Sequence, residues 1–177
     1  MLDQQIFLAI FHLAGQRVWL DTLAIFFSQA IPYLLFISLL IFVVMAKQKK
    51  RELIMLAMAA GACVLSRGII VSLIRLLWHR DRPFLVLHLN PLIPYSNEAS
   101  FPSGHAAFLF ALALVVLFYH KKIGILFLFL AAISSLARVY VGIHWPSDIL
   151  VGAIVGILSG WLIYVAYRKK VKNHSYG

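Results

Sequence analysis

Histidine, aspartate and arginine recur in this chain at spacings that suit the chemistry of a phosphate group. His144 precedes Asp148 by four residues, where one apolar run ends and the next begins. A carboxylate at this spacing can accept the Nδ1–H of the imidazole, which fixes the tautomer and leaves Nε2 free as a nucleophile. Arg138 ends the preceding apolar run and can hold an anion beside the pair. Taken alone, the stretch is also explained by a buried His–Asp pair that joins two helices.

A second stretch, Pro102-Ser-Gly-His105, stands directly before an apolar segment. Proline suits the first turn of a helix, and the free N–H groups of a helix N-terminus bind phosphate. Ser103 can donate its hydroxyl, and Gly104 lets an anion approach the backbone closely. His105 can then give or take a proton beside that anion. The alternative is an ordinary helix start with a capping serine.

The third stretch contains Arg75 and Arg82, and Pro83 follows it. Seven residues make about two helical turns, so both guanidinium groups share one face if the helix continues to Arg82. Two such groups side by side favour an anion between them, and arginine offers phosphate planar, bidentate donors. Arginines that snorkel from a membrane helix to its surface are the alternative.

The composition excludes an ordinary soluble domain. Apolar residues make up 63% and charged residues 12% of the 177 residues, whereas soluble domains average about 45–50% apolar and about 25% charged. The net charge of +10 does not indicate a nucleic-acid partner, because every lysine lies beside a long apolar run. Basic clusters in such places mark cytoplasmic loops. The lysines are Lys47, Lys49, Lys50, Lys121, Lys122, Lys169, Lys170 and Lys172.

Five apolar runs are long enough to cross about 30 Å of hydrocarbon as helices. We therefore predict an all-α, integral-membrane bundle of five transmembrane helices in a single domain, residues 1–177, with its core over 53–167. Pro32 should kink the first helix, since it removes a backbone hydrogen bond. The basic clusters put 79–101 and 143–146 on the outer side of the membrane. The runs are residues 21–46, 53–78, 102–119, 123–142 and 147–167.

The N-terminal segment, residues 1–16, is apolar but short for a span. Its apolar side chains fall on one helical face, formed by Leu2, Ile6, Ile10 and Leu13. We predict an interfacial amphipathic helix on the outer side, and the alternative is a short or tilted sixth span. The segment lacks a basic start and a small-residue cleavage site, so no removable signal peptide is expected.

Together and in this order, the three stretches resemble the tripartite signature of the type-2 phosphatidic acid phosphatase (PAP2) superfamily. The resemblance covers about residues 53–167. It implies that His144 is a nucleophile that forms a phosphohistidine, that Asp148 orients it, and that His105 is the general acid. It also implies that the phosphate oxygens are held by Arg75, Arg82, Ser103, Gly104 and Arg138.

Two positions depart from the family pattern. The family usually has lysine where this chain has Arg75 and serine where it has Ala137. The first change keeps the charge but alters its geometry, and the second removes a hydroxyl donor. The resemblance implies no metal or other cofactor, and the six acidic residues form no cluster of ligands along the sequence.

The implied substrate is a lipid phosphate or diphosphate in the bilayer. The N-terminal segment and residues Asn97–Phe101 resemble bacterial undecaprenyl-diphosphate phosphatases, which implies a bacterial inner membrane and a site facing the periplasm or exterior. Phosphatidylglycerophosphate and lipid A 1-phosphate phosphatases share the same catalytic residues and remain alternatives. Vanadate-dependent haloperoxidases share the pocket but are soluble, and a non-catalytic lipid-phosphate binder has no need of both histidines. The sequence leaves open the oligomeric state and the roles of Arg67, His79 and Arg80.

Overall fold

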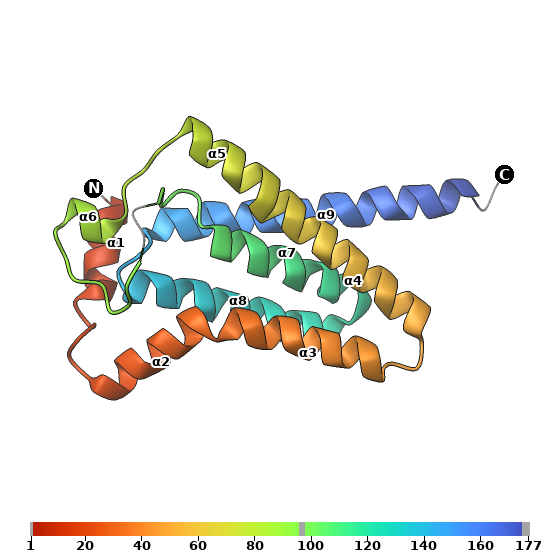
Figure 1. The fold of residues 1–177 in the computed structure, drawn as a ribbon, viewed down its shortest axis with the longest axis horizontal. Coiled ribbons are helices and arrows are strands. Elements are labelled where there is room, and N and C mark those ends of the chain that lie inside the picture. The colour runs from red at the N-terminus through yellow and green to blue at the C-terminus, as the bar shows by residue number, and fades with distance from the viewer. Residues whose placement is uncertain (1, 96–97, 175–177) are drawn as a thin grey trace.

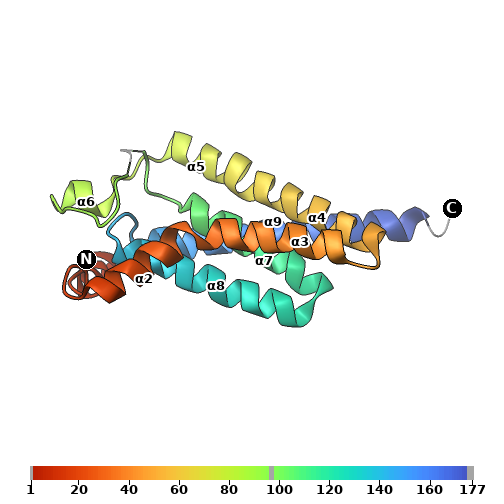
Figure 2. The same ribbon diagram turned by 60° about the horizontal axis from the view of Figure 1, so that its bottom comes forward.

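The structure, a computed structural model, describes residues 2–95 and 98–174, which form helices and loops without strands. The helices lie roughly alongside one another, and α9 extends past the others at the end opposite to α1 and α6 (Figures 1 and 2). The prediction of an all-α bundle is thus confirmed. In chain order the elements are α1 (Leu2–Phe11), α2 (Val18–Gln29), α3 (Ile31–Met45), α4 (Lys49–Cys63), the π-helical η1 (Val64–Val71), α5 (Ser72–Leu77), α6 (Pro83–Val86), α7 (Gly104–Tyr119), α8 (Lys121–Tyr140) and α9 (Pro146–His174).

Three helices of the described chain are long and apolar enough to cross a membrane. They are the continuous segment Lys49–Leu77, α8, and Pro146–Asn173, and a fourth span results if α2 and α3 count as one. At 16 residues α7 is shorter, because the chain enters it at Gly104 rather than at the predicted position 102. It nevertheless packs against α8 and α9 and completes the set of five predicted runs.

The first predicted span is broken at Ala30. Helices α2 and α3 meet there at an angle of 50°, and Pro32 stands at the start of α3. Proline has no backbone N–H to donate into the preceding turn, so a helix readily restarts at this point. The kink predicted from Pro32 is confirmed, and it gives α2 and α3 different directions.

Helices α7 and α9 approach each other along a row of glycines. A Cβ added to Gly152 would lie 2.4 Å from the carbonyl oxygen of Ser103, and one added to Gly156 would lie 2.4 Å from that of Ala107. Gly160 continues the row one turn further along α9. Small residues at this spacing let membrane helices pack backbone to backbone. The row fixes α7 against α9, the two helices whose first turns carry His105 and Asp148.

The N-terminal helix α1 lies at the end of the bundle opposite the C-terminus, near α6 (Figure 1). Its ten residues span about 15 Å, which is half of the hydrocarbon thickness. Phe7 is buried and its ring lies 5.3 Å from that of Trp145, while Leu2 and Ile6 are exposed. This length disfavours the sixth span, and the interfacial position of α1 stays a prediction.

Candidate active site

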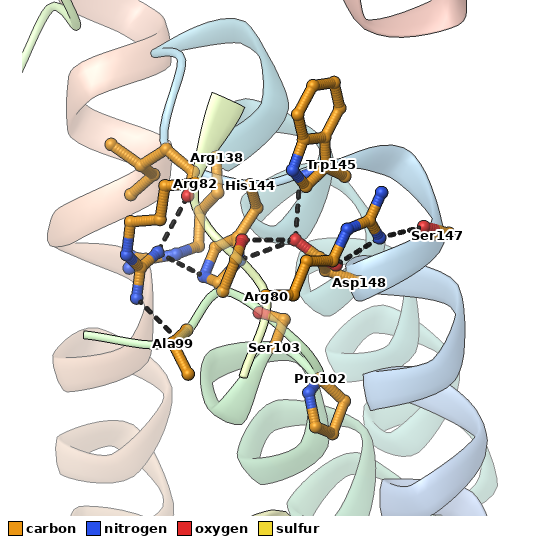
Figure 3. Close-up of polar contacts among 12 residues, drawn as sticks. Arg80, Arg82, Ala99, Pro102, Ser103, Arg138, His144, Trp145, Ser147 and Asp148 are labelled. Atoms are coloured by element: carbon orange, nitrogen blue, oxygen red, sulfur yellow. Dashed lines mark hydrogen bonds and ion pairs between the residues drawn. The ribbon is translucent and has the colours of Figure 1, made fainter. Parts of the chain in front are cut away.

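His144 and Asp148 lie together at the end of the bundle that carries α1 and α6, in the turn between α8 and α9 and in the first turn of α9 (Figures 1 and 3). Nδ1 of His144 lies 3.4 Å from Oδ2 of Asp148. Both side chains are buried. The spacing of four residues therefore forms the oriented histidine–carboxylate pair that the sequence suggests.

Three further groups hold the buried carboxylate of Asp148. Oδ1 accepts a hydrogen bond from Nη1 of Arg80 (2.8 Å), and Oδ2 accepts the N–H of Trp145 (2.9 Å) and the hydroxyl of Ser100 (2.5 Å). These donors compensate the buried negative charge in this position. The carboxylate is therefore fixed in place beside the imidazole ring.

The second nitrogen of His144 is available for chemistry. Nε2 lies 3.3 Å from Nη1 of Arg82, and burial lowers the pKa of His144 to about 3, which the hydrogen bond to Asp148 only partly opposes. The imidazole is therefore neutral near pH 7. A neutral ring whose Nδ1 faces a carboxylate presents the lone pair of Nε2, as a nucleophile requires.

Arg82 is fully buried in the loop before α6. Its guanidinium donates to the carbonyl oxygens of Ile143 (2.7 Å), Glu98 (3.0 Å) and Ala99 (3.3 Å). The side chain also lies over the ring of Tyr95, 4.1 Å from its centroid. These contacts hold the loop before α7 against the turn that carries His144, and they place the positive charge beside Nε2 of that histidine.

His105 lies in the first turn of α7 and is held on both ring nitrogens. Nε2 pairs with the hydroxyl of Ser134 (2.9 Å), which in turn donates to the carbonyl oxygen of Phe27 (2.8 Å). Because that hydroxyl proton is engaged, Nε2 is the nitrogen that carries the ring proton. Nδ1 faces Nη1 of Arg138 at 3.3 Å, so a proton gained on substrate binding would reside there.

Arg138 is buried in the last turn of α8 without a carboxylate partner in the described chain. Nη2 donates to the hydroxyl of Tyr95 (3.0 Å) and Nη1 to the carbonyl oxygen of Ser28 (3.2 Å). Its Nε is buried and has no hydrogen-bond partner among the described residues. An uncompensated buried cation is costly, so this group is suited to an incoming anion.

A cavity of about 560 Å³ reaches His105 and Arg138 from the bend between α2 and α3. No carboxylate is found among the described residues that line it, and Tyr33 at its wall is 72% exposed. The cavity is therefore positively charged inside and accessible at the side of the bundle. Its lining consists of Ser28, Gln29, Pro32, Tyr33, Arg67, Tyr95, His105, Phe108 and Arg138.

The expected shared helix face of Arg75 and Arg82 is not present. Helix α5 ends at Leu77, and Arg82 precedes α6 in an extended conformation, as a residue before proline prefers. Arg75 instead donates to the carbonyl oxygen of Pro102 (3.0 Å). Both arginines still reach the segment before α7, because Nη1 of Arg75 lies 4.0 Å from the carboxylate of Glu98.

Ser103 caps α7, as the alternative interpretation of its stretch expects. Its hydroxyl oxygen accepts the N–H of Ala106 at 3.4 Å, and its own N–H donates to the carbonyl oxygen of Asp148 (3.0 Å). The hydroxyl proton is not used in that cap. Gly104 begins the helix, so its N–H and that of His105 stand at the helix N-terminus.

Sequence reasoning missed three neighbours of the site, Asp3, Ser100 and Ser134, and left the role of Arg80 open. Asp3 accepts hydrogen bonds from Arg80 (2.6 Å) and from the hydroxyl of Ser147 (2.6 Å). It thereby links α1 to the partner of Asp148. Ser134 offered a signal, since it precedes Arg138 by one helical turn on the same helix. Asn97, in the segment compared with undecaprenyl-diphosphate phosphatases, lies outside the described residues.

Solved structures share this architecture. LpxE of Aquifex aeolicus superposes with a TM-score of 0.76 and 26% identity, over 93% of this chain and 95% of that one. A transmembrane PAP2-type phosphatidylglycerolphosphate phosphatase of Bacillus subtilis has a TM-score of 0.70 over 94% of this chain and 85% of that one. At 23% identity the second likeness shows the fold alone.

Sequence comparison adds the family. Undecaprenyl-diphosphatase BcrC of Bacillus subtilis (strain 168) is 30% identical over 164 residues, which cover 92% of this chain and 83% of that protein. The PAP2 superfamily matches residues 56–172, which include the histidine pair, Asp148 and the arginines around them. The chain belongs to the PAP2 superfamily.

Proposed function

We propose that this chain hydrolyses undecaprenyl diphosphate to undecaprenyl phosphate and inorganic phosphate. The observation that carries the proposal is a neutral His144, oriented by Asp148, together with a second histidine, His105, that lines a positively charged cavity beside Arg138. The chain is an integral-membrane protein of the PAP2 superfamily, whose members act on phosphate esters, and its relative BcrC is named an undecaprenyl-diphosphatase. A lipid diphosphate fits both facts.

In the first step, Nε2 of His144 attacks the terminal phosphorus. A nitrogen–phosphorus bond forms while the bond from phosphorus to the bridging oxygen breaks, and the electron pair stays on that oxygen. His105, which is protonated when the anion enters beside it, gives its Nδ1 proton to the oxygen. Lipid monophosphate leaves, and the phosphoryl group remains on His144.

In the second step, water attacks the phosphohistidine. His105 takes a proton from the water, the nitrogen–phosphorus bond breaks, and inorganic phosphate is released. Arg138 and Arg82 lie beside the two histidines and stabilise the equatorial phosphoryl oxygens. Arg75, Gly104 and the hydroxyl of Ser103 complete the phosphate site in this proposal.

The activity test is release of inorganic phosphate by purified protein from a panel of lipid phosphates in detergent. Undecaprenyl diphosphate should be the best substrate, ahead of phosphatidylglycerophosphate and lipid A phosphates, which the same residues can also hydrolyse. EDTA should leave the rate unchanged, and vanadate should inhibit because it adopts the five-coordinate geometry of the transition state. A protein that binds these lipids without releasing phosphate would contradict the proposal.

We also propose that the site faces the periplasm or the exterior of a bacterial inner membrane. Asn90 is exposed in the loop beside α6, at the same end of the bundle as His144. In a Cys63→Ala background, Asn90→Cys should react with a membrane-impermeant thiol reagent added to intact cells. Reaction that occurs only in inverted vesicles would show that position 90 faces the cytoplasm and would contradict the proposed orientation.

Arg80→Gln should lower kcat by about 10- to 150-fold, the value of one charge-assisted hydrogen bond. The change removes a donor from Oδ1 of Asp148, so the carboxylate is less firmly placed and orients the ring of His144 less well. Arg80 does not line the cavity, so KM should be nearly unchanged and Arg80→Lys should restore part of the rate. Arg17→Gln, at an exposed arginine of the same end, is the control; a rise in KM with unchanged kcat would contradict the positioning role.

A further inference from the structure

Arg67 is a charged residue inside a membrane span. It belongs to the continuous helix Lys49–Leu77, and its separation of ten positions from Leu77 corresponds to about 15 Å. That depth is close to the middle of about 30 Å of hydrocarbon. Charged side chains at such depth are costly, face a polar cavity, and mark substrate pathways. Arg67 does line the cavity that contains His105 and Arg138.

The guanidinium of Arg67 has no protein partner in the described chain. The hydrogen bonds and ion pairs among residues 2–95 and 98–174 include its backbone carbonyl, which accepts from Ser72, but not its side-chain nitrogens. The described lining of the cavity holds no carboxylate that could neutralise it. Arg67 and Arg138 therefore present two positive charges to one space, and an anion in that space satisfies both.

The helix that carries Arg67 is irregular at this point. Residues Val64–Val71 form a π-helical segment between α4 and α5. Such turns are rare, widen the helix, and occur frequently at functional sites. The wider turn rotates the side chains that follow it relative to an α-helix, so it sets the direction in which Arg67 points.

Arg67 and His105 line the same cavity. Nη1 of Arg67 is 3.2 Å from the point where a Cβ on Gly104 would lie, which places the guanidinium over the start of α7. His144 does not line the cavity. In an in-line displacement the nucleophile and the leaving oxygen lie on opposite sides of phosphorus. With His144 at one end and His105 at the other, the group beyond the leaving oxygen extends toward the cavity that Arg67 lines.

We infer that Arg67 binds the phosphate that remains on the lipid when a lipid diphosphate is cleaved. The inference rests on the proposed function. It adds that Arg67 makes the protein prefer a lipid diphosphate to a lipid monophosphate. When the bond to the bridging oxygen breaks, the electron pair stays on that oxygen and the retained phosphate gains negative charge next to Arg67. A lipid monophosphate has a carbon chain at the same place, so Arg67 contributes little to its turnover.

The test compares one polyprenyl alcohol that carries either one or two phosphates, with purified full-length protein in detergent. Arg67→Gln should lower the ratio of kcat/KM for the diphosphate to kcat/KM for the monophosphate by about 10- to 100-fold. Arg67→Lys should recover part of that ratio, because it keeps the charge and loses the planar fork. Arg168→Gln, the same substitution at the basic end of α9, should leave the ratio at the wild-type value.

The outcomes separate the inference from the proposed function. An unchanged ratio in Arg67→Gln, or an equal loss on both substrates, overturns the inference even when the wild type is a good diphosphatase. Equal loss is also what a neighbouring membrane lipid held by Arg67 would produce. A wild-type protein that releases no phosphate from either substrate overturns the proposed function first. A selective loss on the diphosphate, partly restored by lysine, supports the inference.

Discussion

His144→Gln is expected to reduce phosphate release by about 10⁴-fold or more, as loss of a nucleophile does in other hydrolases. Glutamine keeps an amide that can reach Asp148 but has no lone pair on nitrogen with which to attack phosphorus. The buried environment that keeps His144 neutral is polar enough, through Asp148 and Arg82, to accept the amide. The measurement is kcat for undecaprenyl diphosphate, with substrate binding measured separately and expected to persist.

His79→Gln is the matched control, because His79 is exposed and its ring pairs with Asp81 at the surface. Brief reaction with substrate labelled in the terminal phosphate should leave acid-labile label on the wild type and on His79→Gln. The same label should be missing from His144→Gln. Activity of His144→Gln within tenfold of the wild type, or label that is still present after the substitution, would contradict the assignment of His144 as the nucleophile.

His105→Ala is expected to lower kcat by about 10²- to 10⁴-fold for a lipid monophosphate, the usual contribution of a general acid. The leaving group of a monophosphate is an alkoxide, which needs a proton as it departs. The leaving group of a diphosphate is a phosphate, a far weaker base, so its turnover should suffer less. The measurement is kcat on both lipids, and His79→Ala serves as the control. Equal losses on both would contradict the acid role.

The two cavity variants should therefore shift selectivity in opposite directions. His105→Ala raises the preference for the diphosphate, whereas Arg67→Gln lowers it. A general loss of folding cannot produce both shifts, because it would lower the two rates together. The pair thus tests the order of groups along the cavity, with His105 at the leaving oxygen and Arg67 beyond it.

The histidine–aspartate pair could be predicted from the sequence because its geometry is local. His144 and Asp148 are four residues apart, so the short turn before α9 and the first turn of α9 bring them together. The kink at Pro32 was predictable for the same reason, since the missing N–H acts within one turn. The five apolar runs also followed from local composition, because lipid leaves an apolar chain no alternative to helix.

The support of the site was not predictable, because it depends on contacts between distant segments. Asp3 accepts a hydrogen bond from Ser147, which lies 144 positions further along the chain, and no rule of sequence spacing predicts such a contact. Helix α9 continues through Arg168–Lys172 to His174, beyond the predicted end at 167, because leaving the apolar run does not end a helix. The direction of the Arg67 side chain could not be predicted from the sequence, because a π-helical turn changes the angle between successive side chains.

The bend between α2 and α3 lines the cavity that reaches His105, and under the proposed function it sets how a lipid substrate arrives. A lipid that enters past Tyr33 moves sideways within one leaflet and leaves its tail among the neighbouring lipids. The encounter is thus a two-dimensional diffusion, and its frequency follows the mole fraction of substrate in the leaflet rather than its amount per volume. Inert lipid added at constant total substrate slows turnover by surface dilution, and carbons of the tail that lie beyond the cavity have little influence on the rate.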